Sequence, residues 1–379
     1  MQHNKQIFIL SILFLGIFFG WQFFSDSGIQ MDGSTEAGTT SIGPNYFEGK
    51  TIEWVIPFKE GGGGDTWARF NAPFLSKYIP GNPTILITNI PGGGSIKGAN
   101  LFAERVKPDG LMILGTSGST QMPYLLDDPR VRYDYADYTP VMAYPTGGVV
   151  YVSKTLGISS AEEIQKIKEL PMIYASQGPT SLDLVPNLAF NLLDMNIKTI
   201  FGFRGRGAGR LAFERGEVKI DYQTSSAYLK NVTPLVASGE AIPLWSWGII
   251  DETGQLQRDP SFPDLPHFGE VFDLMHEGNK EKDISYDAWF ATMAAGFGGM
   301  KLMLVPKETP QAIVEILQNA IREMKKDPEY IAKKQKAIGY YEQVVGSQAQ
   351  VIFDLATSID REEKEWCKEF LRTKYNLNI

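Results

Sequence analysis

Apolar positions change their spacing repeatedly along this 379-residue chain from residue 48 onward. Mostly apolar runs at residues 51–57, 84–90 and 111–114 are typical of buried strands. The segments between them carry apolar side chains at helical spacing. The first of these segments has Trp67, Phe70, Phe74 and Tyr78. Alternating strand and helix signals predict an α/β fold with mainly parallel strands.

The same alternation starts again at residues 149–152, and the chain is longer than a typical single domain. Further strand-like runs lie at residues 172–175, 199–203 and 218–222. We therefore predict two lobes. The first is expected to comprise residues 48–148 and 248–379, and the second residues 149–247.

The first 47 residues have a different pattern. Lys5 precedes an apolar run at residues 7–24, which is long for a signal peptide and just long enough to cross a bilayer. Residues 1–27 are therefore predicted to be a signal peptide or a signal anchor. Small and polar residues predict a flexible tether at 28–47. Export with cleavage is favoured, with a mature N-terminus between Gly28 and Gly38.

Two glycine-rich turns, at residues 61–64 and 92–94, carry most of the functional information. Each follows a strand-like run and precedes a helical pattern. A helix N-terminus presents unpaired N–H groups and the positive end of the helix dipole, which together favour an anion. Two such turns predict a binding site for a small carboxylate. Asp65 is interpreted first as the N-cap of the helix after the first turn, and a role as a ligand contact stays open.

A polar turn at residues 176–181 and an arginine–glycine turn at 204–210 would face these sites from the second lobe. Arginine suits a carboxylate because its planar fork donates two hydrogen bonds. Arg204 is the predicted ligand contact, whereas Arg206 is expected to point to solvent. Phe58 is either a core residue or a wall of the cleft.

Composition excludes several classes of function. A net charge of −8 argues against nucleic acid, which requires a basic face. The single Cys367 cannot form an internal disulfide, and the three histidines lack metal-ligand spacing. The glycine runs lack the Gly-Lys-Ser/Thr of a phosphate-binding loop and do not fit a dinucleotide site well. Because no catalytic set is evident, we expect no enzyme activity, no cofactor and no metal site.

Three motifs resemble the tripartite tricarboxylate transporter receptors, the TctC or Bug-type proteins. The family's opening pattern is a strand ending Pro-Phe, a glycine-rich turn, Asp, and then Ala-Arg. Its second pattern is Asn-x-Pro-Gly-(Ala/Gly)-Gly-x-x-x-Gly, and its third is Tyr-Ala-Ser-x-Gly-x-x-Ser. Here these read Pro57-Phe58 to Gly63-Gly64-Asp65 and Ala68-Arg69, then Asn89 to Gly98, and Tyr174 to Ser181. The likeness covers residues 46–355, although the family's Tyr-Lys-Gly turn is Phe203-Arg204-Gly205 here.

The resemblance implies a type II periplasmic-binding-protein-like clamshell, with mostly parallel sheets, two crossing strands as a hinge and a ligand cleft between the lobes. It also implies an exported, extracytoplasmic receptor, expected to be monomeric, that captures a small di- or tricarboxylate and delivers it to membrane permease subunits. The implied contacts are Phe58, Gly63, Gly64, Asp65, Gly93, Gly94, Ser95, Thr116, Ser117, Ser176, Gly178, Thr180, Ser181 and Arg204. Two alternatives stay open: a ligand sensor anchored through residues 7–24, and an exported α/β enzyme.

Overall fold

The computed structural model describes residues 42–43, 45–251, 254–278, 280–377 and 379. The predicted leader and residues 28–41 and 44 of the predicted tether lie outside these residues, so cleavage or anchoring at 7–24 stays a prediction. The tether prediction is wrong at its C-terminal end, because Phe47 is fully buried in the core of the first lobe. In the part of the chain that is described, no helix combines the length and the apolar character needed to cross a bilayer.

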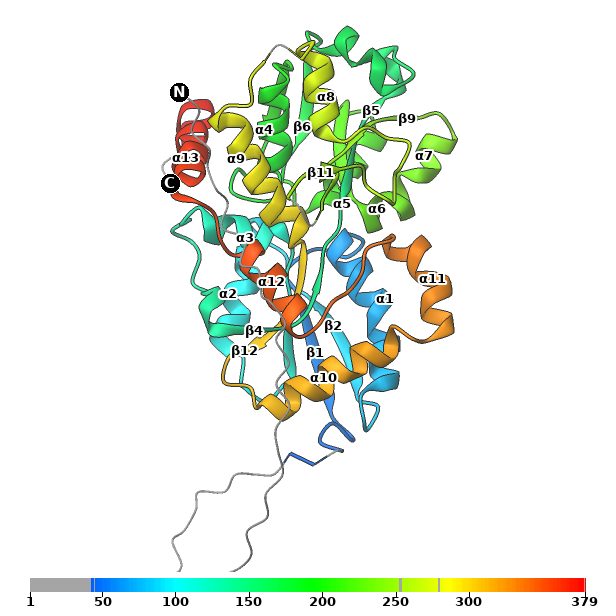
Figure 1. Ribbon diagram of the computed structural model, residues 1–379, viewed down its shortest axis with the longest axis vertical. Coiled ribbons are helices and arrows are strands. Elements are labelled where there is room, and N and C mark those ends of the chain that lie inside the picture. The colour runs from blue at the N-terminus through cyan, green and yellow to red at the C-terminus, as the bar shows by residue number, and fades with distance from the viewer. Residues whose placement is uncertain (1–41, 44, 252–253, 279, 378) are drawn as a thin grey trace, which may run out of the picture. The chain divides into compact units, whose positions relative to one another are not determined.

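The first of two five-stranded sheets has the strand order β2-β1-β3-β12-β4 (Figure 1). Its strands are β1 (Thr51–Ile56), β2 (Thr84–Asn89), β3 (Met112–Gly115), β4 (Tyr138–Tyr144) and β12 (Lys301–Pro306). Strand β1 pairs in parallel with β2 and β3, whereas β12 is antiparallel to both β3 and β4. Four of the five strands therefore run in one direction, with β12 reversed among them.

Helices cover both faces of this first sheet, and together they form the first lobe. On one face, Trp67 and Leu75 pack with Ile313, Leu317 and Tyr330. On the other face, the buried cluster includes side chains of two further helices. The first face carries α1 (Gly63–Tyr78), α10 (Gln311–Met324) and α11 (Pro328–Ile338), and the second carries α2 (Ile96–Arg105) and α12 (Ser347–Ala356). The amphipathic helices thus bury their apolar stripes against the sheet.

The second sheet has the order β7-β6-β8-β5-β9, with β5 antiparallel to β8 and β9. Its strands are β5 (Gly148–Ser153), β6 (Met172–Ala175), β7 (Ile197–Ile200), β8 (Ile220–Thr224) and β9 (Ala241–Ser246). Strand β6 is parallel to β7 and β8, so four of these five strands also share one direction. The sheet and the helices packed on it form the second lobe.

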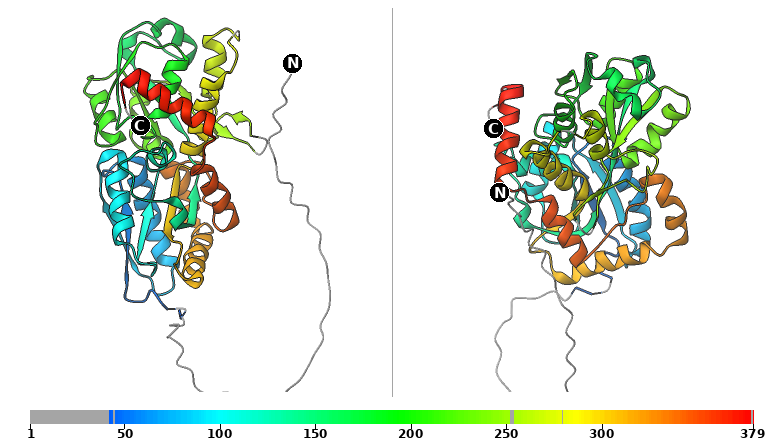
Figure 2. Two further views of the ribbon diagram at one scale, coloured as in Figure 1. Left: turned by 90° about the vertical axis from the view of Figure 1, so that its left-hand side faces the viewer. Right: turned by 45° about the horizontal axis from the view of Figure 1, so that its top comes forward.

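The second lobe draws its helices from distant parts of the chain. One face of its sheet packs with α4 (Leu184–Leu192), α8 (Phe268–Met275), α9 (Ile284–Met293) and α13 (Arg361–Tyr375). The other face packs with α5 (Arg206–Glu214), α6 (Ser225–Asn231) and α7 (Thr233–Ala237). Figure 2 shows the C-terminal helix α13, in red, against this lobe. Helices α8, α9 and α13 fall in the range 248–379 predicted for the first lobe, but their buried side chains join the core of the second.

The remaining elements are short. Helix α3 (Gly118–Leu125) follows β3 and contacts the segment that precedes β12. The others are η1 (Gly93–Ser95), η2 (Tyr135–Asp137), η3 (Lys154–Leu156), η4 (Ala161–Ile167), η5 (Ala294–Gly298), β10 (Ile249–Ile250) and β11 (Leu256–Gln257). The chain leaves the first sheet at residues 145–147 and returns to it at 299–300. Residues 357–360 connect α12 of the first lobe with α13 of the second. They are a third connection between the lobes, in addition to the two crossing strands implied by the resemblance.

Candidate functional site

Two adjoining chambers lie between loops of the two lobes. The first chamber encloses about 640 Å³ and is lined by the loops after β1 and β2 on one side and after β6 and β7 on the other. The second chamber encloses about 560 Å³ and is lined by the N-termini of α1, α3 and α5, the end of β8 and the start of β12. Both chambers are lined by Phe58, Lys59, Pro91, Gln177 and Gly205. The chambers therefore form one divided cleft.

The first glycine turn leads directly into helix α1. Gly62 is the N-cap residue and supplies no side-chain cap. The prediction that Asp65 caps this helix is wrong, because Asp65 lies inside the first helical turn. Its buried carboxylate accepts hydrogen bonds from Gly61 N at 2.9 Å, Arg69 Nε at 2.8 Å and Asn89 Nδ2 at 3.1 Å. Asp65 thus ties the turn to the end of β2, while the N-terminus of α1 stays open toward the second chamber.

The second glycine turn depends on backbone conformations that favour glycine. Gly92, Gly93 and Gly94 have φ values of 139°, 59° and 70°. Other residue types rarely adopt such angles. The turn brings Gly94 to the opposite lobe, where its Cβ position is 3.6 Å from Ser181 Cβ. Residues 92–95 therefore form a wall of the first chamber with little side-chain bulk.

Most of the predicted contact residues line the cleft. Those on the wall of the first chamber are Phe58, Gly93, Gly94, Ser95, Gly178, Thr180, Ser181 and Arg204. Those on the wall of the second are Phe58, Gly63, Gly64 and Ser117. Ligand contact by these residues stays a prediction.

Three predicted contacts lie inside the protein and line neither chamber: Asp65, Thr116 and Ser176. The backbone N–H of Thr116 donates to Leu302 O at 2.9 Å within the first sheet, and that of Ser176 donates to Ile200 O at 2.8 Å. These two residues extend strands of the sheets. Direct ligand contact by the three side chains is not supported by this geometry.

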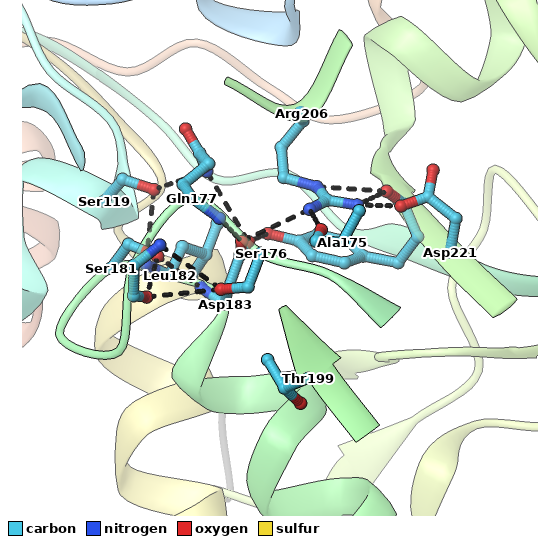
Figure 3. Close-up of polar contacts among 12 residues, drawn as sticks. Ser119, Ala175, Ser176, Gln177, Ser181, Leu182, Asp183, Thr199, Arg206 and Asp221 are labelled. Atoms are coloured by element: carbon cyan, nitrogen blue, oxygen red, sulfur yellow. Dashed lines mark hydrogen bonds and ion pairs between the residues drawn. The ribbon is translucent and has the colours of Figure 1, made fainter. Parts of the chain in front are cut away.

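Arg206 differs most from its sequence prediction. It was expected to be solvated, but only 7% of its side chain is exposed. Its guanidinium group lies between the buried carboxylates of Asp183 and Asp221 (Figure 3). It donates to Asp183 Oδ2 at 3.2 Å, to Ala175 O at 2.6 Å and to Tyr222 O at 3.1 Å, and it also pairs with Asp221. Arg206 is therefore a structural residue, and its charge is already compensated.

This buried network positions residues 176–183, which include the polar turn at residues 176–181. Asp183 also accepts from the backbone N–H of Gln177 at 2.6 Å and from Tyr222 Oη at 2.9 Å. Desolvation, followed by the charge of Asp183, raises the pKa of Tyr222 well above its ordinary value, so its hydroxyl stays protonated and can donate. Desolvation alone would lower the pKa of Arg206, but Asp183 and the nearby tyrosines raise it, and the net shift is upward. The ion pairs of Arg206 with Asp183 and Asp221 thus fix the position of the second lobe's cleft residues.

Hydrogen bonds also join the two lobes beside the cleft. Ser119 Oγ accepts from Leu182 N at 3.2 Å and from Gln177 Nε2 at 3.3 Å (Figure 3). Thr180 Oγ1 donates to Asp128 Oδ2 at 2.7 Å. These contacts connect α3 and the following loop with the polar turn. The hydroxyl of Thr180, a predicted contact residue, is therefore already engaged by the first lobe.

Lys301, at the start of β12, was missed by the sequence analysis. It lines the second chamber, yet its side chain is fully buried. No hydrogen-bond partner of its Nζ atom occurs among the described residues. Desolvation lowers the pKa of Lys301 from 10.5 to about 7. The only available signal was one lysine opening the otherwise apolar run at residues 301–306.

This pKa gives a testable pH dependence of stability. In the unfolded chain Lys301 has its ordinary pKa of 10.5, whereas burial in the folded protein lowers this pKa to about 7. The unfolded state binds more protons between these values, so stability should rise with pH across this window. In the wild-type protein the titration of Lys301 should raise the free energy of unfolding by about 2–3 kcal/mol between pH 7 and about pH 9.5. We expect Lys301→Met to lack this increase. Urea unfolding of both proteins at the two pH values measures this, and parallel profiles would contradict it.

The described part of the chain bears on the expectations for metal binding and for the single cysteine. Among the described residues, no three His, Cys, Asp or Glu side chains are grouped so that they could hold a metal ion. Cys367 is buried in α13, where desolvation raises its pKa to about 12. A thiol with so high a pKa is a poor nucleophile.

Sequence comparison assigns the family. The model of the tripartite tricarboxylate transporter family receptor, TctC, matches residues 69–364. The chain belongs to this family. A TctC-family protein is a substrate-binding receptor rather than an enzyme, and the family implies an extracytoplasmic location. The chain is also 23% identical over 356 residues to the "UPF0065 protein in tcbD-tcbE intergenic region" of Pseudomonas sp. (strain P51), covering 91% of this chain and 92% of that protein.

Solved structures confirm the predicted two-lobe periplasmic-binding-protein fold. The periplasmic binding protein BugD superposes with a TM-score of 0.62 at 20% identity, covering 86% of this TctC-family chain and 99% of BugD. MatC (Rpa3494) from Rhodopseudomonas palustris, solved with bound malate, gives 0.61 at 20% identity, covering 84% and 99%. R. palustris Rpa4515, solved with adipate, gives 0.60 at 20% identity, covering 86% and 98%. The fold and the resemblance stated from sequence are both confirmed.

Proposed function

We propose that this TctC-family receptor captures a small organic di- or tricarboxylate in the divided cleft and delivers it to the membrane permease subunits of a tripartite tricarboxylate transporter. The receptor would be exported, and the leader at residues 1–27 would direct it across the membrane. The glycine turns would hold one carboxylate through backbone N–H groups, and basic side chains would balance its charge.

The observation that carries this proposal is the charge of the first chamber. Among the described residues that line it, every charged side chain is basic: Lys59, Lys97, Arg130 and Arg204. The protein as a whole has a net charge of −8, so this chamber is an exception to its overall composition. A concave site lined by one sign of charge attracts ligands of the opposite sign. Arg130 is paired with Asp128, which leaves three basic side chains for a ligand.

The solved relatives favour a dicarboxylate over other anions. MatC and Rpa4515 share this fold and were solved with malate and adipate, respectively. Both ligands are small organic dicarboxylates. Two chambers joined in one cleft suit a molecule with an anionic group at each end.

A thermal melt against mono-, di- and tricarboxylates tests the proposal. A ligand that binds only the native state raises the melting temperature, and the increase grows with the logarithm of the ligand concentration relative to its Kd. We expect selected di- or tricarboxylates to raise it and simple sugars and amines to leave it unchanged. The bound compound should be recovered unaltered after long incubation. A panel without any stabilising carboxylate would overturn the proposal, and turnover of a tight-binding one would show an enzyme.

Arg204 provides the first mutational test of this site. Its side chain is exposed on the wall of the first chamber, so solvent screens its charge. We expect Arg204→Ala to weaken binding of the best carboxylate by about 1–2 kcal/mol, or about five- to thirty-fold, the range of a charge-assisted hydrogen bond at a partly wet site. Calorimetry measures the change, with exposed Arg322→Ala as the control. Equal effects of the two substitutions would remove Arg204 from the site.

A further inference from the structure

A buried lysine in the second chamber has no carboxylate partner among the described residues. Lysine is almost never fully buried unless it is paired, because removing its charge from water is costly. Lys301 is 0% exposed, and within the described chain its Nζ atom has no hydrogen-bond partner. Its position suits an anion that comes from outside the chain.

Strand register places Lys301 beside residues that already face the chamber. Met303 of β12 pairs with Gly115 of β3, and the bond from Thr116 N to Leu302 O continues this antiparallel ladder. Continued by one more residue, this register would set Lys301 opposite Ser117, whose backbone is extended. Residues opposite each other in an antiparallel pair share one face of the sheet. Ser117 and Lys301 both line the second chamber.

Two further groups in the same wall can donate hydrogen bonds to an anion. The N-terminus of α1, a helix of 16 residues, enters the chamber at Gly63 and Gly64. Thr224, at the end of β8, also lines the chamber, and its buried Oγ1 has no partner among the described residues. The N-terminus of α1, the Thr224 hydroxyl and the Lys301 side chain therefore all line the second chamber. Each of these groups favours negative charge or can donate to it.

The other basic residues of this chamber do not compete for such an anion. Arg206 is held by Asp183 and Asp221, and Arg210 pairs with Glu214. Lys59 is exposed at the boundary with the first chamber. Within the described residues, Lys301 is therefore the buried basic residue of this wall without a carboxylate partner, and the ring centroid of Tyr144 lies 6.0 Å from its Nζ atom.

We propose that Lys301 is a ligand-binding residue whose ammonium group pairs with one carboxylate of an organic dicarboxylate, while the other carboxylate lies in the first chamber. The proposal rests on the proposed function and adds a second anion site to it. The ligand would span the boundary formed by Phe58 and Gln177. A molecule with a single anionic group could occupy the first chamber but would leave Lys301 unpaired.

A cycle of ligand and protein changes tests this pairing. The probes are succinate, glutarate, adipate and pimelate, each compared with its monomethyl ester by calorimetry. We expect Lys301→Met to weaken binding of the tightest dicarboxylate by at least about 30-fold, the lower end of the range for losing one partner of a desolvated charge pair. The same variant should change the affinity of the matching monoester by less than about 3-fold. Lys301→Gln should act in the same direction, and exposed Lys336→Met is the matched control.

The outcomes separate this proposal from the proposed function. If wild-type protein binds a probe and Lys301→Met binds it equally well, the role of Lys301 is overturned and the receptor function stands. If both variants lose the diacid and the monoester to the same extent, specific pairing is also overturned. If wild-type protein binds none of the probes, both proposals fail for this ligand class. A structure of the wild-type complex decides independently of the variants' folding, since a carboxylate oxygen should lie within about 3 Å of Lys301 Nζ.

Discussion

Replacing Arg206 with alanine is expected to lower the free energy of unfolding by about 3–5 kcal/mol. The substitution would leave the carboxylates of Asp183 and Asp221 buried without their shared cation. It would also remove the donors to Ala175 O and Tyr222 O. Burying an unpaired charge costs more than any gain from removing the arginine's own desolvation. Urea unfolding followed by tryptophan fluorescence would measure the loss.

Arg215→Ala is the matched control for Arg206→Ala. Arg215 pairs with Glu217 at the surface, where more than half of each side chain is exposed. An exposed pair contributes about 1 kcal/mol or less. If the two substitutions cost the same small amount, the Arg206 network would not stabilise the second lobe, and its role in positioning the turn at 176–183 would be wrong.

The second large effect is expected at Gly98, where Gly98→Ala should destabilise the protein by about 2–3 kcal/mol. Gly98 lies in α2, at the point where this helix crosses the ends of β1 and β2. A Cβ atom there would lie 2.5 Å from Ile90 O and 2.9 Å from Pro57 Cα. Backbone atoms in two strand ends cannot move aside as a side chain could. The helix must therefore shift away from the sheet, and with it the second glycine turn.

Gly207→Ala supplies the control for the glycine prediction. Gly207 also lies in a helix, α5, but a Cβ atom there meets no atom of the described residues within 4 Å. Alanine should be neutral or stabilising there by up to about 1 kcal/mol, because glycine in a helix loses more entropy on folding. Thermal and urea unfolding of both variants tests the contrast. Equal effects would mean that helix propensity, rather than close packing at Gly98, governs both positions.

The arginine–glycine turn shows where sequence reasoning failed. Arg204 and Arg206 stand two residues apart with similar neighbours. Arg204 was predicted to contact the ligand, and Arg206 was predicted to be exposed to solvent. The structure leaves Arg204 exposed on the chamber wall and buries Arg206. Helix α5 begins at Arg206, which turns its side chain toward β8. Asp183 and Asp221 are 23 and 15 residues away in the chain, so no local pattern indicated that they would meet it.

Local chemistry was enough to predict other parts of the molecule. The alternation of strand and helix patterns indicated the α/β class, because side-chain periodicity reflects which face of each element is buried. The glycine turns were predicted to join strands to helices, and they lead from β1 into α1 and from β2 through η1 into α2. The order and spacing of the three motifs indicated the family, which the comparison confirmed. Each single turn, motif or periodic segment depends on neighbouring residues and can be recognised in a short window.

Local sequence patterns were therefore sufficient to predict the fold class, the family and the turns that border the cleft. The charges that remain available to a ligand, by contrast, depend on how distant segments pack in the folded protein. Arg206 became a buried structural residue because two distant aspartates converge on it. Lys301 became an unpaired cation on the chamber wall because the reversed strand β12 lies between β3 and β4. Whether a charge is paired depends on contacts between residues far apart in the chain, and those contacts exist only once both sheets have formed.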